Sequence, residues 1–158
     1  LLASLPYMSI VFGIIISATV FGLYLTYAQI PQKLTSLILG MDVGPIGFLL
    51  LVNVMLLIMG MLIDSAAVLL IAVPLLYPVA MQLGIDPIHF GIVCILNLSI
   101  GALTPPFGAT MYQCCNLCEI EMPEFLKQGK ELIAALLIAL LVVTFVPGIA
   151  TLLPAMMK

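Results

Sequence analysis

Charged side chains are scarce in this sequence of 158 residues. They make up 7% of the chain, as four lysines, no arginine and seven acidic residues, and the formal net charge is −3. In soluble domains about a quarter of the residues are charged, so this composition excludes an ordinary soluble fold. It also excludes a polybasic surface for nucleic acid or anionic lipid, because four lysines are too few to form one.

The sequence also lacks the patterns of metal and redox centres. Its four cysteines, at positions 94, 114, 115 and 118, do not have the paired spacing of a zinc site. Cysteine is a common small apolar side chain in helices, so we expect structural roles for all four and no bound cofactor. The alternative is a metal or redox pair formed by Cys114 and Cys118, one helical turn apart.

Apolar residues, by contrast, make up 65% of the chain and fall into long uncharged runs. Each run exceeds the roughly 18 to 20 residues that a helix needs to cross a bilayer, which predicts an all-α protein with several transmembrane helices. The first run has no initiator methionine, basic leader or cleavage site, so we expect a membrane helix in a fragment of a longer protein. The runs are residues 1–32, 43–63, 65–85, 87–118 and 132–157.

The two ends of the chain are each expected to contain a transmembrane helix. Residues 6–27 form the first one in this interpretation, and small side chains such as Gly13 and Gly22 would permit close packing against a neighbour. An amphipathic helix over residues 29–39 is expected to follow and to lie along the membrane surface. The last helix should kink or end near Pro147.

Asp64 is the only charged residue between positions 43 and 85, and it separates two apolar arms. Two interpretations are open. In the first, both arms cross the membrane fully and Asp64 lies at the water interface. In the second, both arms are short and form a re-entrant hairpin over residues 45–83. In the second case the tip, formed by Asp64 and Ser65, lies near the midplane of the bilayer.

Residue types around the tip favour the re-entrant hairpin. The turn has almost none of the Gly, Asn, Pro and Lys residues that a turn in water normally carries. Pro74 and Pro78 are expected to shorten the helix of the second arm. An ionisable residue inside the membrane is a functional candidate, which singles out Asp64.

A break is predicted in the middle of the run over residues 87–118. Proline lacks an N–H group and disturbs the residue before it, so consecutive prolines leave backbone groups without helical partners. In hydrocarbon each such group costs several kcal/mol unless protein, water or an ion satisfies it. Breaks of this kind mark the ion and substrate sites of secondary transporters. The alternative is a kinked helix sealed by its neighbours. The residues concerned are Gly101, Thr104, Pro105, Pro106 and Gly108.

Two polar segments flank this run. Asp86 and Pro87 are expected to start the helix as its N-cap and first residue, and His89 is expected to cap or to face the surface, with a proton relay as the alternative. Residues 119–131 hold four glutamates and two lysines, so we expect an aqueous loop there. The positive-inside rule places this loop in the cytoplasm.

Four motifs resemble the large permease subunit of the tripartite ATP-independent periplasmic (TRAP) transporters. They are GMLIDSA at residues 60–66, IDPIHFGI at 85–92, NLSIG at 97–101 and LTPPFG at 103–108. Their order and spacing also fit, together with AQIPQ at residues 28–32, so the resemblance covers nearly the whole sequence.

The resemblance implies the C-terminal part of that subunit, as one of two inverted repeats in an elevator-type ion transporter fold. Residues 1–40 would belong to the scaffold and residues 41–118 to the moving transport part. The cytoplasmic loop, residues 119–131, and the C-terminal helix, residues 132–158, would follow.

The resemblance also implies an activity and its partners. The protein would be a permease of the bacterial inner membrane, and not an enzyme, that imports organic acid anions such as dicarboxylates or sialic-acid-like compounds with sodium as the coupling ion. A small TRAP membrane subunit and a periplasmic substrate-binding protein would assist it. MYQCCNLC at residues 111–118 departs from the small aliphatic segment expected there, and this departure bears on substrate identity.

The residues and the resemblance agree on one candidate site. The hairpin tip and the break would face each other, offering carbonyls and hydroxyls to sodium and positive helix N-termini to a carboxylate. Binding of the ion and the anion would then be reciprocally coupled. The candidate residues are Asp64, Ser65, Asn97, Gly101, Thr104, Pro105, Pro106 and Gly108.

Two other functions stay open. An intramembrane aspartyl protease would need a second carboxylate that shares a proton with Asp64, and the sequence lacks the GxGD pattern. The second is a passive channel or an assembly subunit. Flux that persists without a sodium gradient would favour the channel.

Overall fold

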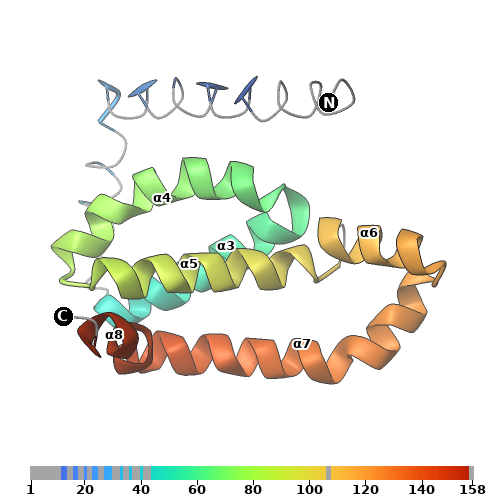
Figure 1. Cartoon of the computed structure of the whole chain (residues 1–158). Coiled ribbons are helices and arrows are strands. Elements are labelled where there is room, and N and C mark those ends of the chain that lie inside the picture. Colours follow the sequence, from blue (N-terminus) through green and yellow to red (C-terminus); the bar gives the residue numbers. More distant parts are fainter. Residues whose placement is uncertain are drawn as a thin grey trace.

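The computed structural model in Figure 1 describes residues 44–105 and 108–156, together with isolated positions between 12 and 40. All regular secondary structure in these residues is helical. The described part therefore agrees with the predicted all-α class. The first transmembrane helix and the amphipathic helix predicted before residue 40 lie largely outside the described residues, and so does Pro106.

Two helices form the predicted hairpin. Helix α3 (Pro45–Leu62) begins with a proline that fits the first turn, and α4 (Ser65–Gln82) follows after only two residues. Asp64 starts α4 because its Oδ2 accepts hydrogen bonds from the N–H groups of Ala66 at 2.9 Å and Ala67 at 3.3 Å. The sequence thus located the turn of the hairpin, while its depth in a membrane stays a prediction.

The expectation that Pro74 and Pro78 shorten the second arm was wrong. Helix α4 continues through Pro74 and Pro78, and each arm has 18 residues. At 1.5 Å per residue this is about 27 Å, and both arms are long and apolar enough to cross a membrane. A proline removes one helical hydrogen bond and bends the helix, and packing on neighbouring helices outweighs this local cost. Figure 1 draws α4 as an arched helix.

Helix α5 (Pro87–Ala102) lies at the centre of the described fold, between α4 and α7 and in front of α3 (Figure 1). Asp86 caps it as predicted, because Oδ1 accepts from the N–H groups of Ile88 at 2.8 Å and His89 at 3.1 Å. Apolar side chains of α3, α4 and α5 form the core. Its aromatic pair, Phe48 and Phe90, stacks with ring centroids 6.4 Å apart.

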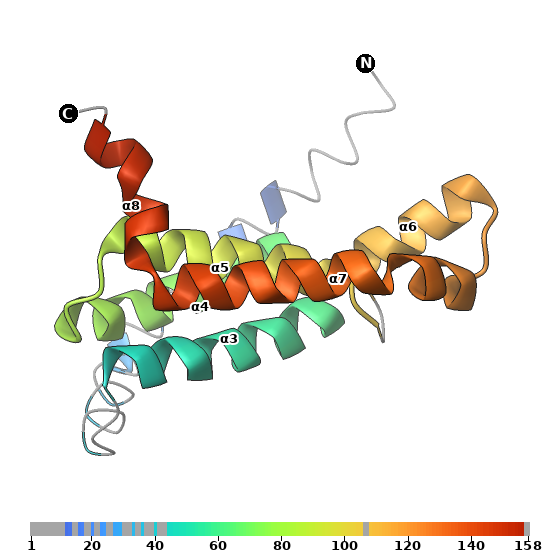
Figure 2. The same ribbon diagram turned by 90° about the horizontal axis from the view of Figure 1, so that it is seen from below.

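Three helices complete the described chain: α6 (Ala109–Cys118), α7 (Met122–Phe145) and α8 (Pro147–Met156). Figures 1 and 2 both show α6 extending beyond the hairpin turn and α7 running back along α5. The predicted interruption near Pro147 is confirmed, because α7 ends before it and α8 begins at it.

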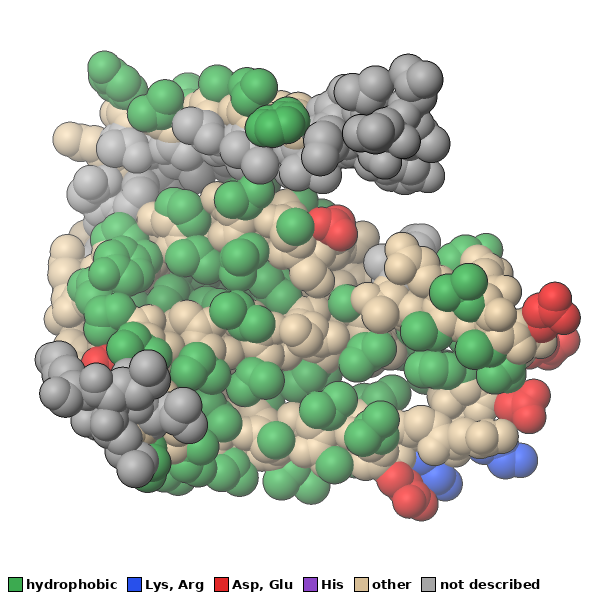
Figure 3. All heavy atoms as spheres, in the orientation of Figure 1, with side chains coloured by type: hydrophobic (Ala, Val, Ile, Leu, Met, Phe, Trp, Pro, Cys, Tyr) green, Lys and Arg blue, Asp and Glu red, His purple; other side chains and the backbone are tan. Residues whose placement is uncertain are grey.

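The prediction that residues 119–131 form a loop was wrong. Only residues 119–121 lie between the helices, and the rest forms the first turns of α7. Pro123 suits a first turn, and the Glu, Lys and Gln residues that follow are good helix formers, so charge did not mean loop. All six charged side chains are nevertheless exposed, and Figure 3 shows charged side chains gathered at this end of the visible face.

Candidate functional site

The hairpin turn lies against the C-terminal half of α5. The Ser65 hydroxyl, in the first turn of α4, donates a hydrogen bond to the carbonyl oxygen of Leu98 at 3.2 Å. This contact crosses between two segments that the sequence predicted to form one site. A shallow groove of about 150 Å³ opens beside it, lined by Ser65, Ala66, Leu69, Ile95, Leu98 and Ser99.

Gly60 and Gly101 let α3 and α5 approach each other closely near the same turn. A methyl group built on Gly101 would lie 2.9 Å from the backbone of Gly60 and 3.1 Å from the Leu57 carbonyl oxygen. Real Cβ atoms essentially never come that close to backbone, so Gly101 is required by packing. The sequence predicted Gly101 as part of a break and named Gly60 only as the start of the GMLIDSA motif, without a packing role.

The predicted break is present. Helix α5 ends at Ala102 and α6 begins at Ala109, so a kinked but continuous helix is excluded. The end of α5 tightens, with the N–H of Thr104 bonded to the Gly101 carbonyl at 3.0 Å. Gly108 adopts φ +33°, where side chains are strained, and a Cβ there would lie 3.0 Å from the Thr104 carbonyl oxygen.

Two side chains near the break are already engaged. The Thr104 hydroxyl donates to the Ile100 carbonyl at 2.7 Å, within its own helix. Pro105 is half-buried, whereas Pro106 lies outside the described residues. At the opposing turn, Asp64 is exposed and caps α4 through Oδ2.

Asn97 is a polar candidate residue that is completely buried, with 0% of its surface exposed. Its Nδ2 donates to Oδ1 of Asn53 at 2.6 Å and to the Val93 carbonyl at 2.9 Å. Its own Oδ1 is buried and has no hydrogen-bond partner. A buried acceptor without a donor is costly, so this oxygen is suited to a bound cation or water molecule.

Sequence reasoning missed two residues that join Asn97. Asn53 on α3 donates through Nδ2 to the hydroxyl of Thr144 on α7 at 2.8 Å, and both side chains are buried. A signal was available, because Asn53 is the only polar side chain in α3. Polar side chains inside apolar helices commonly join neighbouring helices by hydrogen bonds.

The surface or capping role expected for His89 was wrong. The ring is 2% exposed, and Nε2 lies 2.8 Å from the Val143 carbonyl oxygen. A carbonyl can only accept, so Nε2 carries the proton and donates. Asp86 had already supplied the cap of α5, which left the imidazole free to join α5 to α7.

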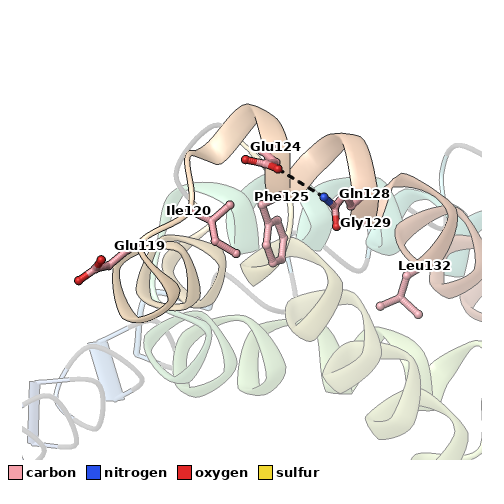
Figure 4. Close-up of a pocket in the computed structure, with 7 residues that line it drawn as sticks. All are labelled: Glu119, Ile120, Glu124, Phe125, Gln128, Gly129 and Leu132. Atoms are coloured by element: carbon pink, nitrogen blue, oxygen red, sulfur yellow. Dashed lines mark hydrogen bonds between the residues drawn. The ribbon is translucent and has the colours of Figure 1, made fainter.

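The cysteines do not gather at the site. Cys94 and Cys115 are buried, and Cys114 and Cys118 are exposed on α6. Among the described residues no group of three metal-binding side chains occurs. A separate hollow of about 430 Å³ lies at the turn between α6 and α7, and its lining includes Glu119, Ile120, Glu124 and Phe125 (Figure 4). It contains none of the predicted site residues.

Residues 1–149 match the family model described as "Tripartite ATP-independent periplasmic transporter, DctM component". The chain belongs to this family. It is 41% identical over 140 residues to a sialic acid TRAP transporter large permease protein of Vibrio cholerae, which covers 89% of this chain and 33% of the relative. It is 36% identical over 144 residues to a C4-dicarboxylate TRAP transporter large permease protein of the same species, over 91% of this chain and 32% of the relative.

A third TRAP relative is an isethionate transporter permease protein of Oleidesulfovibrio alaskensis, 36% identical over 132 residues. This match covers 84% of the chain and 21% of the relative. The chain thus spans about a third or less of these TRAP permeases. No solved structure matches it.

Proposed function

We propose that this chain is part of a sodium-coupled TRAP permease that imports an organic acid anion. Membership of the TRAP family makes a transport role the natural one, and the named substrates of its relatives are C4-dicarboxylates, sialic acid and isethionate. All three carry an acidic group, so an anionic substrate is the common feature. No enzyme activity is proposed.

One observation carries the proposal: the turn between α3 and α4 packs against α5 close to the point where that helix ends. Ser65 bonds to Leu98 across this contact, and α5 ends one turn later at Ala102. Unwound backbone at membrane depth requires protein, water or an ion to satisfy it. The break therefore supports an ion and substrate site between the turn and the end of α5, built from the predicted candidate residues.

The length of α6, which extends past the end of α5, supports a re-entrant hairpin. Its ten residues extend the chain by about 15 Å past the end of α5, and Figures 1 and 2 show the hairpin turn beside that end. The charged turn between α6 and α7 then lies beyond the hairpin tip. A hairpin that ends before the charged surface would enter and leave the membrane from one side, with residues 119–121 on the other.

The proposed mechanism is of the elevator type, in one of two inverted repeats of the bacterial inner-membrane subunit. Sodium would bind first at the tip and the break, and the substrate carboxylate would follow because the cation orders the same backbone. The absent part of the polypeptide would supply the second repeat. A small TRAP membrane subunit and a periplasmic binding protein are the proposed partners, and the cytoplasm is proposed for residues 119–121.

The protease alternative gains no support from the described residues. Asp64 and Asp86 cap α4 and α5 from opposite ends of α4, which is about 27 Å long. Two carboxylates must lie about 3 Å apart to share a proton. A passive channel is the main alternative function. The dependence of uptake on sodium distinguishes it from a sodium-coupled transporter.

Uptake into proteoliposomes tests the proposal. The full-length permease, reconstituted with its small subunit and binding protein, should take up a C4-dicarboxylate, sialic acid or isethionate only with an inward sodium gradient. Equal flux with choline in place of sodium would refute the coupling.

Asp64→Asn should raise the sodium concentration for half-maximal uptake several-fold, because the tip loses its negative charge while Asn still caps α4. Asp86→Asn is the matched control, since it changes the equivalent cap of α5 and should leave the sodium dependence unchanged.

A further inference from the structure

We infer that Thr144 and Asn53 are positioning residues that hold the Asn97 side-chain oxygen toward the coupling cation. This inference rests on the proposed sodium coupling and adds α7 to the site. Three buried side chains on three helices form a directed chain of hydrogen bonds, and the direction of each bond follows from the one before it.

The chain begins on α7. The Thr144 hydroxyl donates its single proton to the Leu140 carbonyl at 2.7 Å, so toward Asn53 it can only accept. Asn53 must therefore turn its Nδ2 to Thr144, at 2.8 Å, and its Oδ1 toward Asn97. The orientation of one amide on α3 is thus set by a hydroxyl on α7.

The same argument fixes the orientation of the Asn97 side-chain amide. Its Nδ2 has two protons, and they go to Asn53 Oδ1 at 2.6 Å and to the Val93 carbonyl at 2.9 Å. The flipped amide would place its oxygen against both of these acceptors, so the flip is excluded. Oδ1 of Asn97 is left as an acceptor that is fully buried and has no partner.

The surroundings favour a cation at this oxygen. Helices α3, α4 and α5 contain no lysine or arginine, so none of these three helices offers a cationic side chain to this oxygen. Asn97 lies five residues before the end of α5, where the carbonyl end of the helix carries partial negative charge. Gly101, one turn further on, brings α3 close at that end. An amide oxygen is a suitable ligand for a hard cation.

Sodium dependence in Thr144 variants tests the inference. In the full-length protein, Thr144→Val keeps the shape but removes the acceptor, so Asn53 and Asn97 lose their fixed orientation. We expect the sodium concentration for half-maximal uptake to rise about tenfold, with uptake at saturating sodium largely retained. Thr144→Ser keeps the hydroxyl and should restore the wild-type value. Thr151→Val removes the comparable hydroxyl bond to the Pro147 carbonyl on α8 and serves as the matched control.

Sodium-induced thermal stabilisation of the purified protein provides a second readout that does not need transport. It should require more sodium in Thr144→Val and in Asn97→Ala. If Thr144→Val fails to fold, Asn53→Leu/Thr144→Val removes both polar partners at once and should fold with the same loss of sodium sensitivity.

The outcomes separate the two ideas. Wild-type protein without any response to sodium refutes the coupling and this inference together. A wild-type response that Thr144→Val leaves unchanged refutes the positioning role alone. An unchanged sodium response in Asn97→Ala would mean that Oδ1 binds water, and it would also refute the inference.

Discussion

At the residue scale, single atoms decide how closely the hairpin approaches the broken helix. Gly60 and Gly101 meet backbone to backbone, and Ser65 bonds to the Leu98 carbonyl beside them. The motif NLSIG contains a glycine for this packing reason as well as for its place before the break. An added methyl group at Gly101 has only backbone atoms to push against, and backbone cannot rotate out of the way.

Gly101→Ala should therefore destabilise the full-length protein by about 1 to 3 kcal/mol, as overpacked interiors do. Thermal unfolding of the purified protein measures this loss. Gly91→Ala is the matched control on the same helix, because nothing lies within 4 Å of its Cβ position. It should leave stability unchanged or raise it by about 0.5 to 1 kcal/mol, since Ala is the better helix former. Equal stability of the two variants would show that α3 and α5 can separate without cost.

At the scale of the elements, the helices differ in how they respond to proline. Pro74 and Pro78 lie inside a continuous α4, whereas the pair at positions 105 and 106 follows the end of α5. An isolated proline costs one hydrogen bond, which packing can offset. Two consecutive prolines leave no helical continuation, because the residue before each one is also displaced from helical geometry.

Pro105→Ala/Pro106→Ala should favour a continuous helix through the break and abolish sodium-driven uptake. The carbonyls proposed for the ion would then bond within the helix. The protein should stay folded and inserted, because a proline in a helix interior costs about 3 kcal/mol relative to Ala in soluble hosts. Pro74→Ala is the control inside α4, and it should retain uptake. Near-normal uptake by the double variant would move the proposed site elsewhere.

At the scale of the whole molecule, the reach of the helices determines where the hairpin turn lies. Helix α7 has 24 residues and is long enough to cross a membrane, and most of its side chains are exposed in the described fold. The exposed apolar side chains of α7 are suited to contact lipid or the rest of the full-length polypeptide. The turn at Asp64 lies beside the end of α5, and α6 extends beyond it (Figure 2).

Cysteine labelling tests the depth of the turn. In a full-length background without the native cysteines, Gln128→Cys on the exposed start of α7 should react rapidly with an impermeant maleimide from the cytoplasmic side. Ala66→Cys at the turn should react at least about tenfold more slowly, because a re-entrant tip lies in a narrow space that sodium narrows further. Equal rates from that side would show that both arms cross the membrane fully.

The sequence by itself determined the elements that depend on local chemistry. Long uncharged runs specified membrane helices, Asp64 and Asp86 specified two helix starts, and the consecutive prolines specified the break. It misjudged residues 119–131 because exposed charges are equally compatible with a helix. It also misjudged the effect of Pro74 and Pro78, since a local cost of bending does not show what packing offsets.

Only the tertiary structure decided which polar residues meet. Asn97 and Thr144 lie 44 and 91 positions after Asn53, and nothing in the local sequence of the three residues fixes a common partner. Their hydrogen bonds arise because α3 and α7 both pack on α5. The same packing buries His89 against the Val143 carbonyl and brings Gly60 against Gly101. Local patterns specify where helices begin and end, whereas contacts between distant helices depend on which faces the whole chain brings together.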